Sequence, residues 1–87
     1  PKHSERVFFS TVCLHKPGGL LELLEIIAKH GVNMTKIESR PVKNSHGNYR
    51  FFIEADCDID GEKTKEMLAA IQANTLECKL LGAYNHE

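Results

Sequence analysis

The stretch that decides the fold is VNMTKIESRPVKNSHGNYRFFIEADC, residues 32–57. Residues 32–42 are expected to form one strand, and residues 49–57 alternate apolar with polar side chains as a second strand does. The polar, glycine-containing residues 43–48 lie between them as a hairpin loop. Pro41 cannot donate a hydrogen bond to a neighbouring strand. The pattern therefore predicts a β-hairpin whose first strand lies at a sheet edge or ends at Pro41.

Strict alternation along this first strand predicts which side chains share a face. It places Asn33, Thr35, Ile37 and Ser39 on one face, and Met34, Lys36, Glu38 and Arg40 on the other. Glu38 and Arg40 then point the same way and are expected to pair with each other or across the sheet. An exposed pair of this kind contributes only about 0–1 kcal/mol. Taken alone, residues 37–41 (IESRP) are typical of a solvated strand edge, where a second copy of the chain could also pair.

Outside this hairpin the chain twice places a helix next to a strand. Residues 6–14 (RVFFSTVCL) are rich in β-branched and aromatic side chains, which predicts a strand buried on both faces. Residues 20–30 carry apolar side chains at helical spacing, and Gly31 follows as a stop signal. Residues 62–74 place Met67, Leu68 and Ile71 on one side of a second helix. Residues 76–84 complete the order as a last strand.

The order βαββαβ defines the expected fold class. Right-handed crossovers around one central hairpin predict an α+β, ferredoxin-like sandwich, with a four-stranded antiparallel sheet and two helices on one face. The other face of the sheet is expected to carry apolar residues. Such a face would need a ligand, a nucleic acid or another subunit to cover it.

Length and composition limit the function classes. The 87 residues are expected to form a single domain over residues 1–87, with a core from about 6 to 84. A domain this small buries only about 60% of the surface that its unfolded chain exposes, so it often depends on a partner. The formal net charge of -1 argues against a general electrostatic grip on nucleic acid or anionic lipid.

The ends and the apolar runs of the chain predict its location. The longest apolar runs fall well short of the roughly 18 residues of a membrane span, and the start has no signal-peptide pattern. We therefore expect no membrane contact and a cytoplasmic location. The chain starts at Pro1 without a methionine, which predicts a piece of a longer enzyme.

Metal, cofactor and catalytic patterns are not found in the sequence. Cys13, Cys57 and Cys78 form no Cys-x-x-Cys pair, so we expect buried thiols in a reducing compartment. The five histidines have no ligand spacing. Residues 15–20 (HKPGGL) lead into a helix start whose unpaired N–H groups suit a carboxylate or a phosphate, but the Lys-Ser/Thr ending of a Walker loop is missing. No general acid, general base or nucleophile stands out.

Two other kinds of protein share this element order. The RNA-recognition motif carries aromatic side chains on its bare sheet face. Here Arg50 stands where that motif has a small residue between aromatic ones, and the net charge is slightly negative, so we expect no nucleic acid. Acylphosphatase needs an arginine-bearing loop after the first strand, and residues 15–18 (HKPG) contain no arginine.

Three strings together closely resemble one family. They are PGGLLELLEIIAKHGVNMTKIESRP, GNYRFFIEADCD and CKLLGAYN, and they resemble the ACT domain, a small regulatory module that binds amino acids. The specific resemblance is to the version at the C-terminus of prephenate dehydratase, and it runs from about residue 6 to 84. The turn motif would be weak alone. Its pairing with the strand motif at a fixed distance makes the resemblance specific.

The resemblance implies a site for L-phenylalanine or another aromatic amino acid. The family's two phenylalanine-binding motifs fall on a turn, Gly18, Gly19, Leu20 and Leu21, and on a strand, Glu38, Ser39, Arg40 and Pro41. Asn33 matches a polar position near the bound amino acid, and Met34 adds to the niche for its ring. Family pockets form between two ACT domains, so the resemblance implies a homodimer in which the turn of one subunit faces the second strand of the other.

We expect the ligand's carboxylate on the helix N–H groups and its ammonium on acceptors such as the Asn33 side chain or backbone carbonyls. Ser39 is expected to close a hydrogen bond near the ligand, while Glu38 and Arg40 lock strand and interface geometry. The implied function is allosteric feedback control of a prephenate dehydratase in phenylalanine biosynthesis, with the catalytic domain of the parent enzyme as a partner. The dehydratase's catalytic Thr-Arg-Phe motif is absent, so this chain by itself is not expected to be an enzyme.

The sequence leaves alternatives to the dehydratase. Gly19 replaces the family's usual alanine and Met34 its usual leucine, which leaves side-chain selectivity open. Aromatic amino acid hydroxylases carry a related ACT domain with the same Ile-Glu-Ser-Arg-Pro string. The ending LGAY, residues 81–84, and the absence of Trp favour the dehydratase. A dimerisation module without a ligand is the alternative of a different class.

Overall fold

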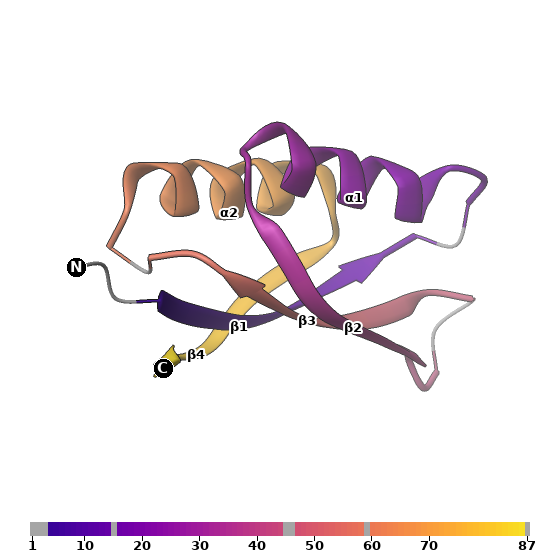
Figure 1. Ribbon diagram of the computed structural model, residues 1–87. Helices are drawn as coiled ribbons and strands as arrows, with labels where there is room; N and C mark the ends of the chain where they lie inside the picture. Colours follow the sequence, from indigo (N-terminus) through magenta and orange to yellow (C-terminus); the bar gives the residue numbers. More distant parts are fainter. Residues whose placement is uncertain (1–3, 15, 45–46, 59, 87) are drawn as a thin grey trace.

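The computed structural model describes residues 4–14, 16–44, 47–58 and 60–86 and confirms the predicted α+β, ferredoxin-like sandwich. The elements are β1 (Ser4–Cys13), α1 (Gly19–Lys29), β2 (Asn33–Pro41), β3 (Tyr49–Asp56), α2 (Glu62–Asn74) and β4 (Glu77–His86). The strands form one antiparallel sheet in the order β2-β3-β1-β4. Both helices lie on the same side of this sheet (Figure 1). β2 is therefore an edge strand, as Pro41 predicts.

The predicted element bounds agree closely with the structure. The bounds of α2 are as predicted, and every other helix or strand begins and ends within two residues of its predicted limits. Residues 45–46 of the predicted hairpin loop and residue 15 of the turn before α1 lie outside the described residues.

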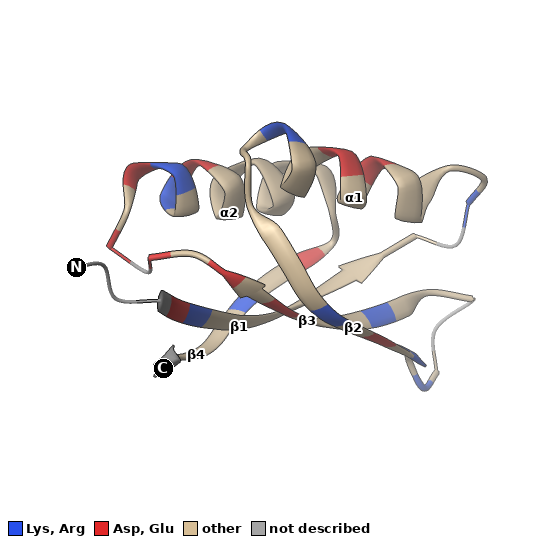
Figure 2. Ribbon diagram, in the orientation of Figure 1, with Lys and Arg blue, Asp and Glu red and all other residues tan. Residues whose placement is uncertain are grey.

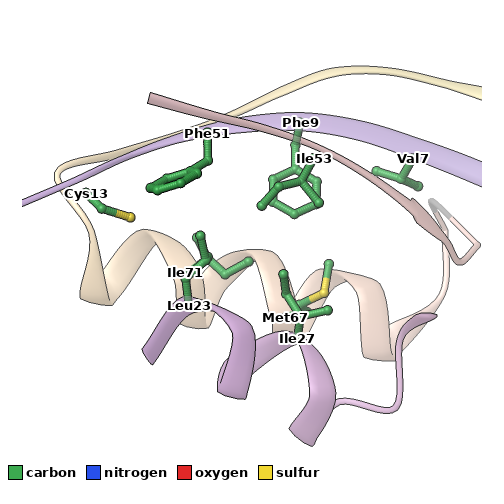
Figure 3. Packing of buried hydrophobic residues seen from close by; sticks show 9 residues of the cluster. All are labelled: Val7, Phe9, Cys13, Leu23, Ile27, Phe51, Ile53, Met67 and Ile71. Carbon is green, nitrogen blue, oxygen red and sulfur yellow. The ribbon is translucent and has the colours of Figure 1, made fainter. Parts of the chain in front are cut away.

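The core lies between the sheet and the two helices (Figure 3). Alternate side chains of β1 and β3 point towards the helices. On the helices, Leu23 and Ile27 are four residues apart, as are Met67 and Ile71, so each pair lies on one helix face. The buried cluster consists of Val7, Phe9, Cys13, Leu23, Ile27, Phe51, Ile53, Met67 and Ile71. Full burial of a Leu, Ile or Phe side chain contributes about 1.5–3 kcal/mol, so this cluster fixes both helices on the sheet.

A β-bulge in β2 corrects the predicted faces of that strand. The pairing of β2 with β3 shifts between Met34 and Lys36, which leaves Thr35 as an extra residue. The side facing the helices receives Met34, Ile37 and Ser39, and the open side receives Asn33, Lys36, Glu38 and Arg40. The prediction from strict alternation is therefore wrong for Asn33, Met34 and Thr35: the extra residue reverses the side chains before it, and the Thr35 hydroxyl donates to the Glu54 carboxylate on the open side (2.9 Å). Met34 packs against the core instead.

A second bulge interrupts β4, the other edge strand. Its pairing with β1 passes from Gly82 opposite Phe8 to Leu80 opposite Phe9, so Leu81 is the extra residue. The interruption falls in the middle of β4, whereas the bulge in β2 falls near its start.

The open face of the sheet is more polar than the sequence predicts. Arg6 pairs with Glu54 at 3.2 Å and with Asp56 at 2.8 Å. Arg50 pairs with Glu77 at 2.7 Å. Charged residues of both signs lie along the strands (Figure 2). Cross-strand ion pairs occupy part of this side, and the partly buried Phe8 and Phe52 also lie on it, so the open face is mixed rather than uniformly apolar.

Candidate functional site

The turn before α1 leaves backbone donors available at a helix start. Gly18 has a φ of 80°, a left-handed conformation that favours glycine, and no side chain of the described residues caps the helix. The first intrahelical bond runs from the N–H of Glu22 to the carbonyl of Gly18 (2.9 Å). The N–H groups of Leu20 and Leu21 precede that bond, so they have no intrahelical acceptor. Neither N–H donates to another described residue, and two such adjacent donors at a helix start suit an anion.

Gly19 lies against the end of β1. A Cβ atom at this position would be 3.0 Å from the backbone oxygen of Leu14. Glycine lets the first turn of α1 approach the strand this closely. This close approach is a structural reason for glycine at position 19, where the resemblance leads one to expect alanine.

A cavity of about 490 Å³ opens beside this turn, and we call it the turn hollow. Its walls are Cys13, Leu14, Lys16, Gly18, Gly19, Leu20, Leu21, Tyr49 and Phe51. All four predicted turn residues are therefore gathered in one cavity, together with the end of β1 and the start of β3. Small-molecule pockets span roughly 300–1,000 Å³ and are mostly apolar with a few polar groups, and the turn hollow has this size and composition.

Several walls of the turn hollow were missed by the sequence analysis: Cys13, Leu14, Lys16, Tyr49 and Phe51. Alternation along residues 49–57 correctly places Tyr49 and Phe51 on one face. Which strand lies beside the turn depends on the sheet order, in which β3 is the neighbour of β1. Motif spacing carries no signal for that order.

The predicted strand residues lie beside the turn hollow rather than within it. Glu38, Ser39, Arg40 and Pro41 line a separate, open depression of about 390 Å³, which we call the strand hollow. Ser39 pairs with Phe51, and Pro41 pairs with Tyr49. Directly paired residues share a face of a sheet, so Ser39 and Pro41 lie on the same side as the turn hollow. Tyr49 and Phe51 line the turn hollow and are the strand partners of Pro41 and Ser39, two walls of the strand hollow.

Glu38 and Arg40 face the other way. They pair with Phe52 and Arg50 on the open side of the sheet, and both are exposed. Within the described ranges they form no ion pair, either with each other or across the sheet. In one copy of the chain they are therefore separated from the turn hollow by the sheet itself.

Asn33 and Met34 lie at the far end of β2. Asn33 and Pro41 are eight residue steps apart along the strand, and a strand rises about 3.3 Å per residue, so they are roughly 26 Å apart. Met34 is half-buried against the core. A single copy of the chain therefore does not bring the predicted ammonium acceptor to the turn hollow.

The thiols of the chain are not poised for chemistry. Burial raises the pKa of Cys13, Cys57 and Cys78, which keeps each thiol protonated at neutral pH. Cys13 serves the turn hollow as an apolar wall. In the described ranges, no group of three His, Cys, Asp or Glu side chains could hold a metal ion. None of the described helices is long and apolar enough to cross a membrane.

The fold and the glycine turn together define a class of regulatory domain. Residues 7–72 match the family model of the ACT domain, which is most of the chain. The chain therefore belongs to the ACT domain family. As the sequence predicts, it is a regulatory domain.

Relatives of the chain include both kinds of enzyme named above. The chain is 39% identical over 69 residues to the bifunctional chorismate mutase/prephenate dehydratase of Aquifex aeolicus, covering 79% of this chain and 19% of the relative. It is 38% identical over 81 residues to the phenylalanine-4-hydroxylase of Dictyostelium discoideum, covering 86% of this chain and 18% of the relative. The crystal structure of prephenate dehydratase from Arthrobacter aurescens in complex with L-Phe matches with a TM-score of 0.84 at 31% identity, covering 94% of this chain and 27% of that one.

The chain thus spans about a fifth to a quarter of the length of these relatives. The resemblance to the ACT domain of prephenate dehydratases is confirmed.

Proposed function

We propose that this ACT domain binds L-phenylalanine and serves in the feedback control of phenylalanine synthesis, as the regulatory part of a prephenate dehydratase. The turn hollow carries the proposal, because a helix start with free N–H groups opens there onto an apolar, partly aromatic cavity. This combination suits a small molecule with a carboxylate at one end and a ring at the other. The L-Phe in the structure of the Arthrobacter relative supports this ligand.

The free edge of β2 supports a site shared by two copies of the chain. β2 lies at one end of the sheet, and beside it are exposed apolar side chains, Leu20 (43% exposed), Leu21 (58%) and Ile37 (36%). An unpaired strand edge is a template for pairing with another chain. Homodimers are mostly twofold symmetric, so we infer an antiparallel pairing of β2 with the β2 of a second copy.

A twofold axis at Ile37, the middle residue of β2, would bring the Asn33 end of the partner's β2 backbone to the site. Asn33 and Pro41 each lie four residues from Ile37, so Asn33 of the partner subunit would lie opposite Pro41. The Asn33 side chain points to the open side of the sheet, so the acceptor for the ligand's ammonium on the side of the turn hollow would be a backbone carbonyl at this end of the partner's β2. The N–H groups of Leu20 and Leu21 would hold the carboxylate.

The strand motif has two roles in this arrangement. Ser39 lies on the side of the turn hollow and can hydrogen-bond near the ligand, while Glu38 and Arg40 brace the strand pairing from the open side. A ligand that touches both subunits binds one dimer arrangement better than others and shifts the population towards it. Catalytic domains attached to the two copies would respond to that shift.

Calorimetry of the 87-residue chain with L-phenylalanine, L-tyrosine and L-tryptophan tests the proposal, with the mass in solution measured in parallel by sedimentation. We expect heat with L-phenylalanine and the mass of a dimer. A folded dimer that gives no heat at millimolar ligand would leave a dimerisation module without a ligand. A folded monomer that gives no heat would contradict the shared site as well.

The relative from Dictyostelium favours a second candidate, the regulatory domain of an aromatic amino acid hydroxylase. The two candidates share an amino-acid site and differ in the catalytic domain that it controls. Assays of the longer protein that carries this domain separate them. Turnover of prephenate that L-phenylalanine inhibits supports the dehydratase, and hydroxylation of phenylalanine supports the alternative.

A further inference from the structure

We propose that Lys16 is a specificity-determining residue of the turn hollow. Its ammonium binds the carboxylate of the amino acid, and Glu22 competes for that ammonium when the hollow is empty. The inference rests on the amino-acid site proposed above and adds the group that selects a free carboxylate.

Lys16 lies at the boundary between two cavities. It lines the turn hollow, and it also lines a neighbouring cavity of about 310 Å³ that shares the walls Cys13, Leu14 and Gly19 with it. We call this second cavity the helix-end hollow, because its walls include residues 73–76 at the end of α2 and in the link to β4. The Lys16 side chain can therefore serve either cavity.

Glu22 holds the ammonium on the side away from the amino-acid site. The Nζ of Lys16 lies 3.5 Å from Oε1 of Glu22, and about half of each side chain is exposed. Glu22 lines the helix-end hollow and is not among the walls of the turn hollow. Exposed ion pairs are weak, so a carboxylate arriving in the turn hollow can displace Glu22.

The turn hollow needs this charge for its proposed ligand. Among the described residues that line it, Lys16 is the one charged side chain. Glu22 lies in the first turn of α1, where a carboxylate is favoured by the helix dipole. It thus acts as an internal substitute for the ligand's carboxylate. A lysine ammonium adds a charge-assisted hydrogen bond to the backbone donors, so the site selects amino acids with a free α-carboxylate.

Substitutions of both partners test this competition, with the Kd for L-phenylalanine measured by calorimetry on the 87-residue chain. We expect Lys16→Met to weaken binding roughly three- to tenfold, because a charge-assisted bond at a half-exposed site is lost. Lys16→Arg keeps the charge and should stay within about twofold. Glu22→Gln should strengthen binding about two- to fivefold, because the competitor is removed. A merely structural role of the pair predicts weaker binding in both Lys16→Met and Glu22→Gln.

Matched controls come from α2. Lys65→Met and Glu66→Gln are exposed and outside both hollows, so each should keep the parent Kd within about twofold, as surface substitutions commonly do. Absence of binding by the parent chain would overturn the proposed function and this inference with it. If the parent binds but Lys16→Met is unchanged, or Glu22→Gln weakens binding, the competition is wrong while the amino-acid site stands.

Discussion

Gly18 determines how the backbone turns from β1 into α1. Its φ is 80°, in a region of backbone conformation that residues with a Cβ rarely adopt. A Cβ built at Gly18 has no described atom within 4 Å, so space is not the constraint. A larger residue would therefore destabilise the turn through backbone strain alone.

We expect Gly18→Ala to lower the free energy of unfolding by about 1 kcal/mol, the usual cost of a left-handed conformation for a residue with a Cβ. Urea unfolding followed by circular dichroism measures it. Gly82→Ala is the matched control, because a Cβ there also has no described atom within 4 Å and Gly82 is not among the glycines with positive φ. The control should stay within about 0.5 kcal/mol of the parent. Equal effects of the two substitutions would contradict the strain at Gly18.

At the scale of the elements, one carboxylate on the open face joins all four strands. Glu54 on β3 accepts hydrogen bonds from Tyr84 on β4 (2.8 Å), Thr35 on β2 (2.9 Å) and Arg6 on β1 (3.2 Å). The hydrogen bond from Tyr84, then that from Thr35, and the charge of Arg6 hold the pKa of Glu54 below its ordinary value. The same carboxylate raises the pKa of Tyr84.

The lowered pKa of Glu54 makes the sheet sensitive to acid. Because its folded-state pKa lies below the ordinary value of 4.5, the ionised carboxylate stabilises the fold above that pH, and the contribution is lost as pH falls through the folded-state pKa. We expect Glu54→Gln to lose less of its unfolding free energy than the parent between about pH 7 and pH 3. Tyr84→Phe should lie between the two. Parallel curves for the parent and Glu54→Gln, measured by urea unfolding across pH, would rule out this role.

The elements also show what the sequence could predict. Periodicity predicted the bounds of the helices and strands to within two residues. The apolar residues of both helices follow the helix period, and β3 alternates without interruption. The bulge at Thr35 was not predicted, because the extra residue arises from the pairing with β3 and is not visible in the apolar and polar pattern of β2. The turn residues of the site were predicted from local motifs. The walls from β3 could not be, because they depend on which strands are neighbours.

At the scale of the whole molecule, the β2 edge and the open face of the sheet differ in character. The edge at β2 continues into the exposed apolar side chains of α1, Leu20 and Leu21, while the open face carries ion pairs. Burial of apolar area drives association, whereas charged groups must lose water. We therefore expect association along the β2 edge rather than through the open face.

Substitution at each edge tests which one is used. We expect Ile37→Glu to convert the dimer to a monomer and to weaken L-phenylalanine binding at least tenfold, on the order of the 1–3 kcal/mol lost when a charge enters an apolar contact. Leu81→Glu on β4 is the control, at a similar exposed fraction (43% against 36%). It should leave both mass and affinity unchanged. Sedimentation and calorimetry read the two properties, and dissociation by Leu81→Glu instead would assign the interface to β4.

The bulge at Leu81 also limits how far such an assembly can grow. A sheet with two equally open edges can add copies at both ends and extend into a fibre, whereas a single usable edge is consumed once two copies have joined. β4 is interrupted in its middle at Leu81, but β2 pairs regularly from Lys36 to Pro41. We therefore expect the sheet to stop growing at the dimer. The β4 edge of each subunit then stays unpaired, and the chain does not polymerise.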